Sequence, residues 1–223
     1  MSKKPLKKTD IDKAWLRKRR DLRRSINPEY HLIVTEGEMT EPKYFEGIQQ
    51  IINSKYRERI HLEICGEGCN TVNLFDIAVR RARQNPNGYK HVWIVYDTDD
   101  FPKDKVDAVP VLCKHQSTED CQYHAIWSNQ CIELWFLLHF GYMHADLYRK
   151  EYFVKLNEQF AMRGMGEYRK NRSNIFAMLL PYINIAISNA KKLAILNLHR
   201  TPSASAPGTN MHELMDVLHP WIK

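Results

Sequence analysis

The sequence His91–Tyr96, HVWIVY, which runs directly into Asp97, Thr98 and Asp99, decides the fold. A nearly continuous apolar run of this length is typical of a central parallel strand that is covered on both faces. Residues two apart on an extended chain point to the same side, so Asp97 and Asp99 can present carboxylates roughly 7 Å apart, from a rise of about 3.3 Å per residue. The stretch therefore predicts a buried strand with a pair of acids at its carboxyl end.

Strand-like and helix-like segments alternate on both sides of this strand. Apolar runs and alternating patterns predict further strands at residues 31–35, 60–64 and 122–127. Apolar residues at helical spacing predict helices at 40–52, 71–84, 105–114 and 131–140, the last capped by Ser128 and Asn129. Beyond Gly141 we expect helices at 146–162, 173–187 with a break at Pro181, 190–198 and 211–222. This alternation predicts an α/β fold with a mostly parallel sheet and helices on both faces.

Positive charge is concentrated at the start of the chain. Residues 1–25 contain eleven Lys or Arg and three Asp, a local balance of +8, whereas the whole chain has a net charge of +7. We therefore divide the chain into a basic N-terminal arm (1–28), an α/β core (29–145) and a helical C-terminal extension that packs on the core (146–223).

The basic arm is expected to attract a polyanion such as DNA or RNA, in a way that depends strongly on salt and not on base sequence. The alternative is a solvated leader that only aids solubility. The residues expected to bind nucleic acid are Lys13, Arg17, Lys18, Arg19, Arg20, Arg23 and Arg24.

The composition excludes several classes of protein. The 223 residues are 43% hydrophobic and 26% charged, which is ordinary for a globular protein. The sequence has no apolar run of 18 residues and no apolar segment beside its basic N-terminus, so we expect a cytoplasmic protein that does not enter a membrane. Five cysteines without paired CxxC spacing predict buried free thiols and not a zinc site. No GxxxxGK[ST] motif is present, so ATP hydrolysis has to come from a partner.

A further acid follows the first predicted strand, where Glu36 precedes Gly37. Reactive groups of an open α/β sheet gather outside the carboxyl ends of its strands. There, Glu36 could move a proton and Gly37 could let a backbone approach closely, while Asp97 and Asp99 suit Mg²⁺ or Mn²⁺ together with phosphate oxygens. Three acids with no Lys or Arg between them repel one another, so we expect a bound metal to compensate. Taken singly, each acid could instead be a turn former or a helix cap.

Three motifs occur in the order found in a known family: EGEMTEPKYF at residues 36–45, DTD at 97–99 and SNQCIELWFLLHF at 128–140. Together they resemble the RloB-like family over roughly residues 30–222. The family is regarded as having a Toprim-like domain, the metal-dependent fold shared by topoisomerases, DnaG-type primases and overcoming-lysogenization-defect nucleases. The resemblance implies Toprim-like phosphodiester chemistry in bacterial anti-phage defence, beside an AAA- or ABC-type ATPase partner.

The resemblance also implies a role for each matching residue. Glu36 corresponds to the general acid or base, and Asp97 and Asp99 correspond to the metal-binding pair. Glu133 would supply a further metal contact, and its alternative is a favourable interaction with the positive N-terminus of its helix.

Other matching residues would support these acids. Gly37, Glu41 and Asn129 would lie around the site, although Glu41 could equally stabilise the start of its helix. Lys191 matches a basic position of the family loosely and would stabilise charge in the transition state. Its alternative is a place on a solvated helix face.

Two functions of different classes fit these observations. The first is a Mg²⁺- or Mn²⁺-dependent endonuclease that acts on DNA or RNA, tRNA included, and is regulated by a partner. The second is a catalytically silent nucleic-acid-binding or sensor module that works with a partner ATPase. A phosphatase acting on small molecules fits the acids but leaves the basic arm unexplained. The helical C-terminal third could complete the core or form the interface of a homo-oligomer.

Overall fold

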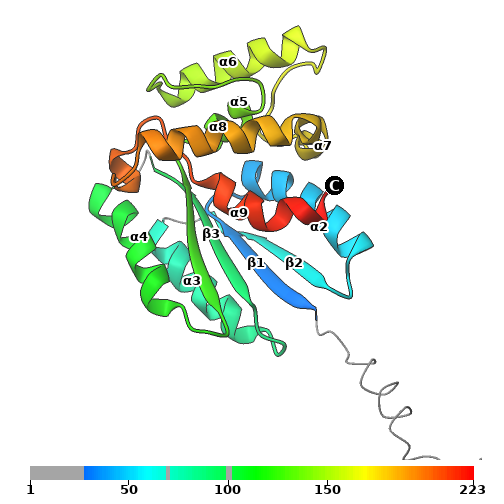
Figure 1. Cartoon of the computed structure of the whole chain (residues 1–223), viewed down its shortest axis with the longest axis vertical. Coiled ribbons are helices and arrows are strands. Elements are labelled where there is room, and N and C mark those ends of the chain that lie inside the picture. Colours follow the sequence, from blue (N-terminus) through cyan, green and yellow to red (C-terminus); the bar gives the residue numbers. More distant parts are fainter. Residues whose placement is uncertain (1–27, 69–70, 99–101) are drawn as a thin grey trace, which may run out of the picture.

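The structure is a computed structural model that describes residues 28–68, 71–98 and 102–223 (Figure 1). Asp99, Cys69 and the basic arm therefore lie outside the described residues. All the arm residues predicted to bind nucleic acid lie outside the described residues: Lys13, Arg17, Lys18, Arg19, Arg20, Arg23 and Arg24.

Four parallel strands form one sheet in the order β2-β1-β3-β4. They are β1 (Glu29–Thr35), β2 (Ile60–Gly66), β3 (His91–Asp97) and β4 (Gln122–Ser128). The prediction of a mostly parallel sheet is confirmed, and the apolar strand β3 lies in its interior between β1 and β4. Because all four strands run the same way, the residues that follow β1 and β3 meet at one edge of the sheet.

Helices cover both faces of the sheet (Figure 1). Side chains alternate along each strand, so the sheet contributes to two separate apolar layers. On one face, α3 (Thr71–Gln84) and α4 (Lys103–Gln116) pack over the layer that contains Leu32, Val34 and Ile94. On the other face, α2 (Thr40–Lys55) and α9 (Met211–Leu218) pack over the layer that contains Ile33, Trp93 and Val95. Each aliphatic side chain buried in this way contributes about 1.5–3 kcal/mol to folding.

The C-terminal third adds a further helical layer beyond α2 and α9. Its helices are α5 (Glu133–Leu138), α6 (Arg149–Met162), α7 (Ile175–Leu179) and α8 (Ile183–Leu196), with short 3₁₀ helices η2 (Leu180–Tyr182), η3 (Pro202–Ala204) and η4 (His219–Trp221). Every residue of α5 is buried, and this helix packs against α6 and α8 (Figure 1). Residues from both sides of position 145 share one hydrophobic cluster, so the C-terminal helices complete the core.

The edge strand β4 is covered by the segment that leads into α9. Ser128 forms an isolated antiparallel bridge with Thr209. The Asn210 amide donates to the Ala125 carbonyl at 2.8 Å and accepts from the Trp127 N–H at 2.7 Å, as a neighbouring strand would. These contacts satisfy backbone groups that an open sheet edge would leave for another chain.

Three of the predicted helices differ from the structure. The apolar run 131–140 forms a helix only over Glu133–Leu138. The segments 173–187 and 190–198 are not two helices with a break between them, because α8 continues unbroken through Ser188 and Asn189 after an interruption around Pro181. Asn189 is tolerated inside this helix since its buried amide donates to the Leu138 carbonyl at 2.9 Å.

Within the described residues, no helix is long and apolar enough to cross a membrane.

Candidate active site

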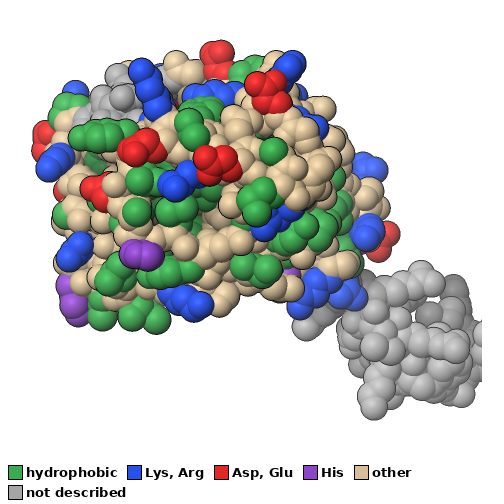
Figure 2. Space-filling view, turned by 90° about the horizontal axis from the view of Figure 1, so that it is seen from above, with side chains coloured by type: hydrophobic (Ala, Val, Ile, Leu, Met, Phe, Trp, Pro, Cys, Tyr) green, Lys and Arg blue, Asp and Glu red, His purple; other side chains and the backbone are tan. Residues whose placement is uncertain are grey.

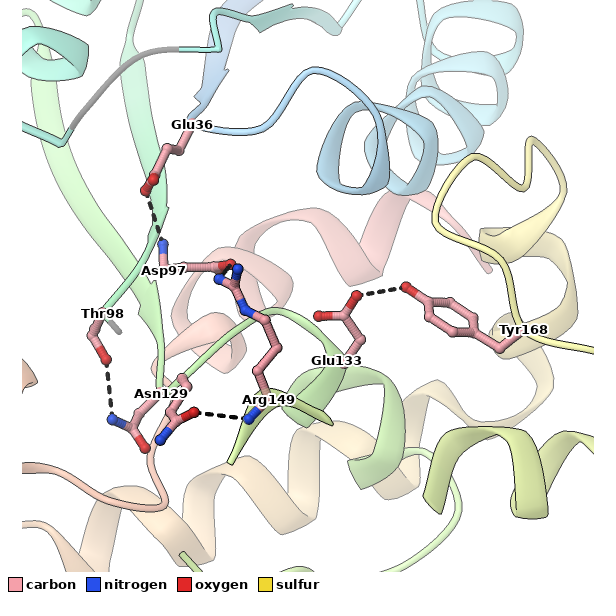
Figure 3. A network of polar contacts seen from close by, with 8 residues as sticks. Glu36, Asp97, Thr98, Asn129, Glu133, Arg149 and Tyr168 are labelled. Carbon is pink, nitrogen blue, oxygen red and sulfur yellow. Dashed lines mark hydrogen bonds and ion pairs between the residues drawn. The ribbon is translucent and has the colours of Figure 1, made fainter. Parts of the chain in front are cut away.

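Glu36 and Asp97 lie next to each other at the carboxyl edge of the sheet, directly after β1 and at the end of β3. The Glu36 N–H donates to the Val95 carbonyl at 3.0 Å and extends the pairing of β1 with β3 by one residue. The Glu36 carboxylate in turn accepts the Asp97 N–H at 3.2 Å (Figure 3). The structure thus brings together two of the three acids predicted from the strand ends, and the third, Asp99, lies outside the described residues.

Two further carboxylates are buried close to Asp97. Only 6% of Glu41 and 2% of Glu133 are exposed, and the Asp97 side chain is 16% exposed. Burial raises the pKa of Asp97 well above its usual value, and the negative charges of Glu41, Glu133 and Glu36 raise it further. The site is therefore a group of acids that repel one another in a poorly solvated place.

Arg149 supplies positive charge within this group. It is the first residue of α6, and its guanidinium Nη2 lies 3.2 Å from Asp97 Oδ2 (Figure 3). Its charge lowers the pKa of both Asp97 and Glu41, against the larger effect of burial. The expectation that no Lys or Arg lies between the acids is thus wrong. The contact between Arg149 and Asp97 could not be predicted from the sequence, because Arg149 follows Asp97 by 52 residues and lies in a helix without a recognisable motif.

Glu41 lies in the first turn of α2 and folds back over the loop that follows β1. A Cβ atom on Gly37 would overlap the Glu41 carboxylate, so a larger residue at position 37 would force this carboxylate to shift. Burial raises the pKa of Glu41, and the charge of Glu133 adds to this effect, while Lys170 and Arg149 oppose it. Gly37 and Glu41 therefore lie at the site, and their packing depends on each other.

Glu133 is the first residue of α5, whereas the predicted helix began at residue 131, and its side chain points toward Tyr168 (Figure 3). The Tyr168 hydroxyl donates to Glu133 Oε1 at 2.8 Å (Figure 3). Burial and the negative charge of Glu133 raise the pKa of Tyr168, so the hydroxyl keeps its proton and donates. Tyr168 comes from the segment between α6 and α7 and was not found from the sequence, because only the folded chain brings it to Glu133.

Asn129 connects the ends of two strands and does not cap α5. Its amide donates to Thr98 Oγ1 at 3.1 Å, and its backbone N–H donates to the Gly208 carbonyl at 2.8 Å. The N-cap position of α5 is Ile132, without a side-chain hydrogen bond. The predicted capping by Ser128 and Asn129 is therefore wrong, since the Ser128 hydroxyl instead pairs with Thr209. Asn129 still lies beside the residue that follows Asp97.

Lys191 lies on α8 in an ion pair away from the strand ends. Its Nζ is 2.8 Å from Asp216 Oδ1 on α9, and both side chains are about half exposed. The charged neighbours that act on Asp97 are Glu41, Glu133, Glu36 and Arg149. Among the described residues, Arg149 is thus the cation in contact with Asp97.

The donor atoms at the strand ends are carboxylate oxygens, which are the ligands that Mg²⁺ and Mn²⁺ prefer. Within residues 28–68, 71–98 and 102–223, no group of three or more His, Cys, Asp or Glu is arranged to hold a metal ion. Asp99 is not among these residues, and Asp97 Oδ2 contacts Arg149. The chemistry of the donors fits a hard divalent cation that would share Asp97 with Arg149.

The four described cysteines are free thiols. Cys113 and Cys131 are buried, while Cys65 and Cys121 are half-buried. Burial raises the pKa of the Cys131 thiol, and the nearby charges of Glu133 and Asp97 act in the same direction. A thiol held protonated in this way is a poor metal ligand and a poor nucleophile.

A four-stranded parallel sheet flanked by helices, with half-buried carboxylates at the carboxyl ends of its two interior strands, is consistent with a Toprim-like α/β fold. Residues 31–218 match the family described as RloB-like protein, and the chain belongs to this family. No curated protein and no solved structure matches the chain.

Proposed function

We propose that the protein hydrolyses phosphodiester bonds of DNA or RNA, with Mg²⁺ or Mn²⁺ bound at the carboxyl edge of the sheet. The observation that carries this proposal is the adjacency of Glu36 and Asp97, whose carboxylates come from neighbouring strands and are linked through the Asp97 N–H. Carboxylates that gather in spite of mutual repulsion are typical of sites that bind a cation or move a proton.

Asp97 would hold the metal together with Asp99, which follows two residues later in the sequence, and Glu133 would add a contact in an orientation fixed by Tyr168. When bound, the cation would polarise the phosphate and lower the pKa of a coordinated water. The negative charge of Glu41 acts on Asp97 and would favour cation binding.

Glu36 would take a proton from the attacking water or return one to the leaving oxygen. The Glu36 carboxylate accepts a hydrogen bond from the Asp97 N–H. This backbone group fixes the orientation of the Glu36 carboxylate relative to Asp97. Arg149 would stabilise the charge that develops on the phosphate, which is the role that the sequence assigned to Lys191.

The family suggests the biological setting of this reaction. The resemblance to the RloB-like family supports a role in bacterial anti-phage defence, and because the sequence has no GxxxxGK[ST] motif, any ATP hydrolysis would come from a separate AAA- or ABC-type partner. We propose that such a partner regulates cleavage.

A cleavage assay tests this function. Purified protein is incubated with plasmid DNA, single-stranded DNA and total tRNA in Mg²⁺, Mn²⁺ or EDTA, with and without the partner ATPase. We expect metal-dependent cleavage of one of these substrates, reduced at least 100-fold in Asp97→Asn and Glu36→Gln, since each change removes a group that acts on the reacting atoms.

The matched control is Glu46→Gln, which removes one carboxylate of α2 that pairs with Lys43 on the surface. This variant is expected to cleave as fast as wild type. Equal rates in Asp97→Asn, Glu36→Gln and wild type would refute the assignment.

The Arg149–Asp97 ion pair also favours a second candidate, the catalytically silent nucleic-acid-binding or sensor module. An arginine that neutralises Asp97 lets the acids coexist without a metal. For this candidate we expect salt-sensitive binding of nucleic acid, with no cleavage in any metal or with any partner.

A further inference from the structure

The segment between α6 and α7, residues 163–174, carries a local group of positive charges beside the acids. We name it the basic loop; it contains Arg163, Arg169, Lys170 and Arg172 against a single acid, Glu167. Basic, acidic and hydrophobic side chains are interspersed over this end of the molecule (Figure 2). The charge of the basic loop is thus a local feature and not part of a uniformly positive surface.

Tyr168 fixes the middle of the basic loop against the acidic site. Its hydroxyl donates to Glu133, and its backbone N–H donates to Asn157 Oδ1 at 2.8 Å. Its buried ring packs against Phe153 and Phe160. Because both the hydroxyl and the backbone N–H of Tyr168 form hydrogen bonds, the residues that follow it have a fixed position relative to Glu133.

The four cations of the loop have different surroundings. Arg163 is held in the fold, since its guanidinium lies over the Phe140 ring at 4.4 Å and donates to Gln159 Oε1 at 2.7 Å. Arg169 is 73% exposed and pairs with Glu167, two residues away, in an exposed contact that adds little stability. Lys170 is exposed, and its charge acts on Glu41 of the site.

Arg172 has a preorganised guanidinium at the surface. It donates to the Glu167 carbonyl at 2.8 Å and to Asn174 Oδ1 at 3.1 Å, and these bonds curl the loop around it. Gly166, in the left-handed region at φ 74°, allows this curl. Glu167, Arg169, Asn171 and Arg172 line a surface hollow of about 310 Å³.

We infer that the basic loop binds a backbone phosphate of the nucleic acid, with Arg169 and Arg172 as its main ligands and Lys170 as a further positive charge whose field reaches the acids. This inference rests on the proposed function for the identity of its ligand. A nucleic-acid strand carries a charge about every 3.4 Å along the helix axis, so a strand with one phosphate at the carboxylates presents its next phosphates to the flanking surface. Arginine is suited to this task because its planar fork binds two phosphate oxygens at once.

The inference is tested by binding without cleavage. The full-length protein is titrated against a fluorescent single-stranded or duplex oligonucleotide in EDTA, and anisotropy is followed between 50 and 200 mM salt. The variant Arg169→Ala/Arg172→Ala should bind about 10-fold more weakly, and the slope of log K against log salt should fall by about 1, as expected for one lost phosphate contact.

A matched control removes the same charge elsewhere. Arg57→Ala/Arg59→Ala changes two exposed arginines just before β2. They lie at the amino ends of the strands, opposite the carboxyl ends that carry the acids, so this variant should alter the affinity less than 2-fold. Arg169→Lys/Arg172→Lys, which keeps the charge, should keep the salt slope. Circular dichroism confirms that each variant is folded. Equal losses in the two alanine pairs, or no loss in either, would overturn the inference.

Two further comparisons separate this inference from the proposed function. A protein that cleaves, but whose basic-loop variant binds and cleaves like wild type, refutes the inference and leaves the nuclease assignment intact. A protein that binds nucleic acid through the basic loop but never cleaves it refutes the nuclease assignment and leaves the inference intact. Unlabelled polynucleotide should displace the probe at a far lower phosphate concentration than mononucleotide or inorganic phosphate, and equal displacement by all three would overturn a polymer-binding role.

Discussion

Arg149 changes how the charges of the acidic site are balanced. The guanidinium lies 3.2 Å from the Asp97 carboxylate, while three other carboxylates act on the same group. Removing one partner of a largely buried ion pair leaves the other charge without compensation. Arg149 therefore holds together a site whose acids would otherwise destabilise the fold.

We expect Arg149→Ala to lower the free energy of unfolding by about 1–2 kcal/mol, a value below that of fully buried pairs because both side chains are partly exposed. Urea unfolding at pH 7 measures this change. Lys191→Ala is the comparison, since it breaks an exposed pair with Asp216 and should cost less than about 0.5 kcal/mol. Equal effects of the two substitutions would show that the Arg149–Asp97 ion pair contributes no more to the free energy of unfolding than the exposed Lys191–Asp216 pair.

Gly37 and Glu41 form a packing pair that can be tested by a double-mutant cycle. The Cβ of Gly37→Ala would overlap the Glu41 carboxylate, so the substitution should cost about 1–2 kcal/mol. In a Glu41→Ala background the obstruction is gone, and most of this cost should disappear. Urea unfolding of the four proteins gives the coupling free energy, and a value near zero would contradict the proposed contact.

At the scale of the elements, the starts of β1, β3 and β4 carry a cluster of histidines around Trp93. His91 Nδ1 lies 2.9 Å from His124 Nε2, and the His124 ring stacks on Trp93 with centroids 4.0 Å apart. Burial lowers the pKa of His31 to about 3 and that of His124 to about 4, and each is lowered further by its histidine neighbours. These rings are therefore neutral in the folded protein at pH 7.

This cluster predicts a loss of stability in mild acid. The unfolded histidines take up protons near pH 6.5 and the folded ones do not, so their contribution is complete above pH 6.5 and falls as the pH drops toward 4. Between pH 6.5 and 5, wild type should lose about 1 kcal/mol more than His124→Gln, which lacks one such group. Urea unfolding at several pH values measures the difference, and parallel curves would contradict the prediction.

The sequence predicted most of the elements because their signals are local. The strand His91–Asp97 and its neighbours follow from apolar runs and alternation, and the predicted strand at residues 31–35 correctly placed Glu36 at a strand end. The contacts made by Arg149, Tyr168 and Asn189 were missed. Each depends on a partner 35 to 52 residues away, and no local pattern marks such a contact.

At the scale of the whole molecule, the candidate site draws on both parts of the chain. The acids come from residues 36–133, whereas Arg149 comes from α6 and Tyr168 from the segment between α6 and α7. Asn210 also covers the edge of β4. The C-terminal helices thus complete the site as well as the core.

A fragment that ends at residue 145 should therefore fail to fold on its own. It would expose the fully buried helix α5, which packs against α6 and α8, and it would open the edge of β4. Circular dichroism melting and binding of a hydrophobic dye to the purified fragment test this expectation. A cooperative melting transition like that of the full chain would show that the C-terminal helices are dispensable.

The central claim is that the strand-end carboxylates hold a divalent cation, and a thermal-stability titration with Mg²⁺ and Mn²⁺ tests it most directly. A ligand that binds only the folded state stabilises it by about 2.7 kcal/mol at a concentration 100 times its Kd. We predict a metal-dependent rise in the melting temperature of wild type and of Glu46→Gln, and none in Asp97→Asn. A rise of the same size in Asp97→Asn, or no rise in wild type, would contradict the account.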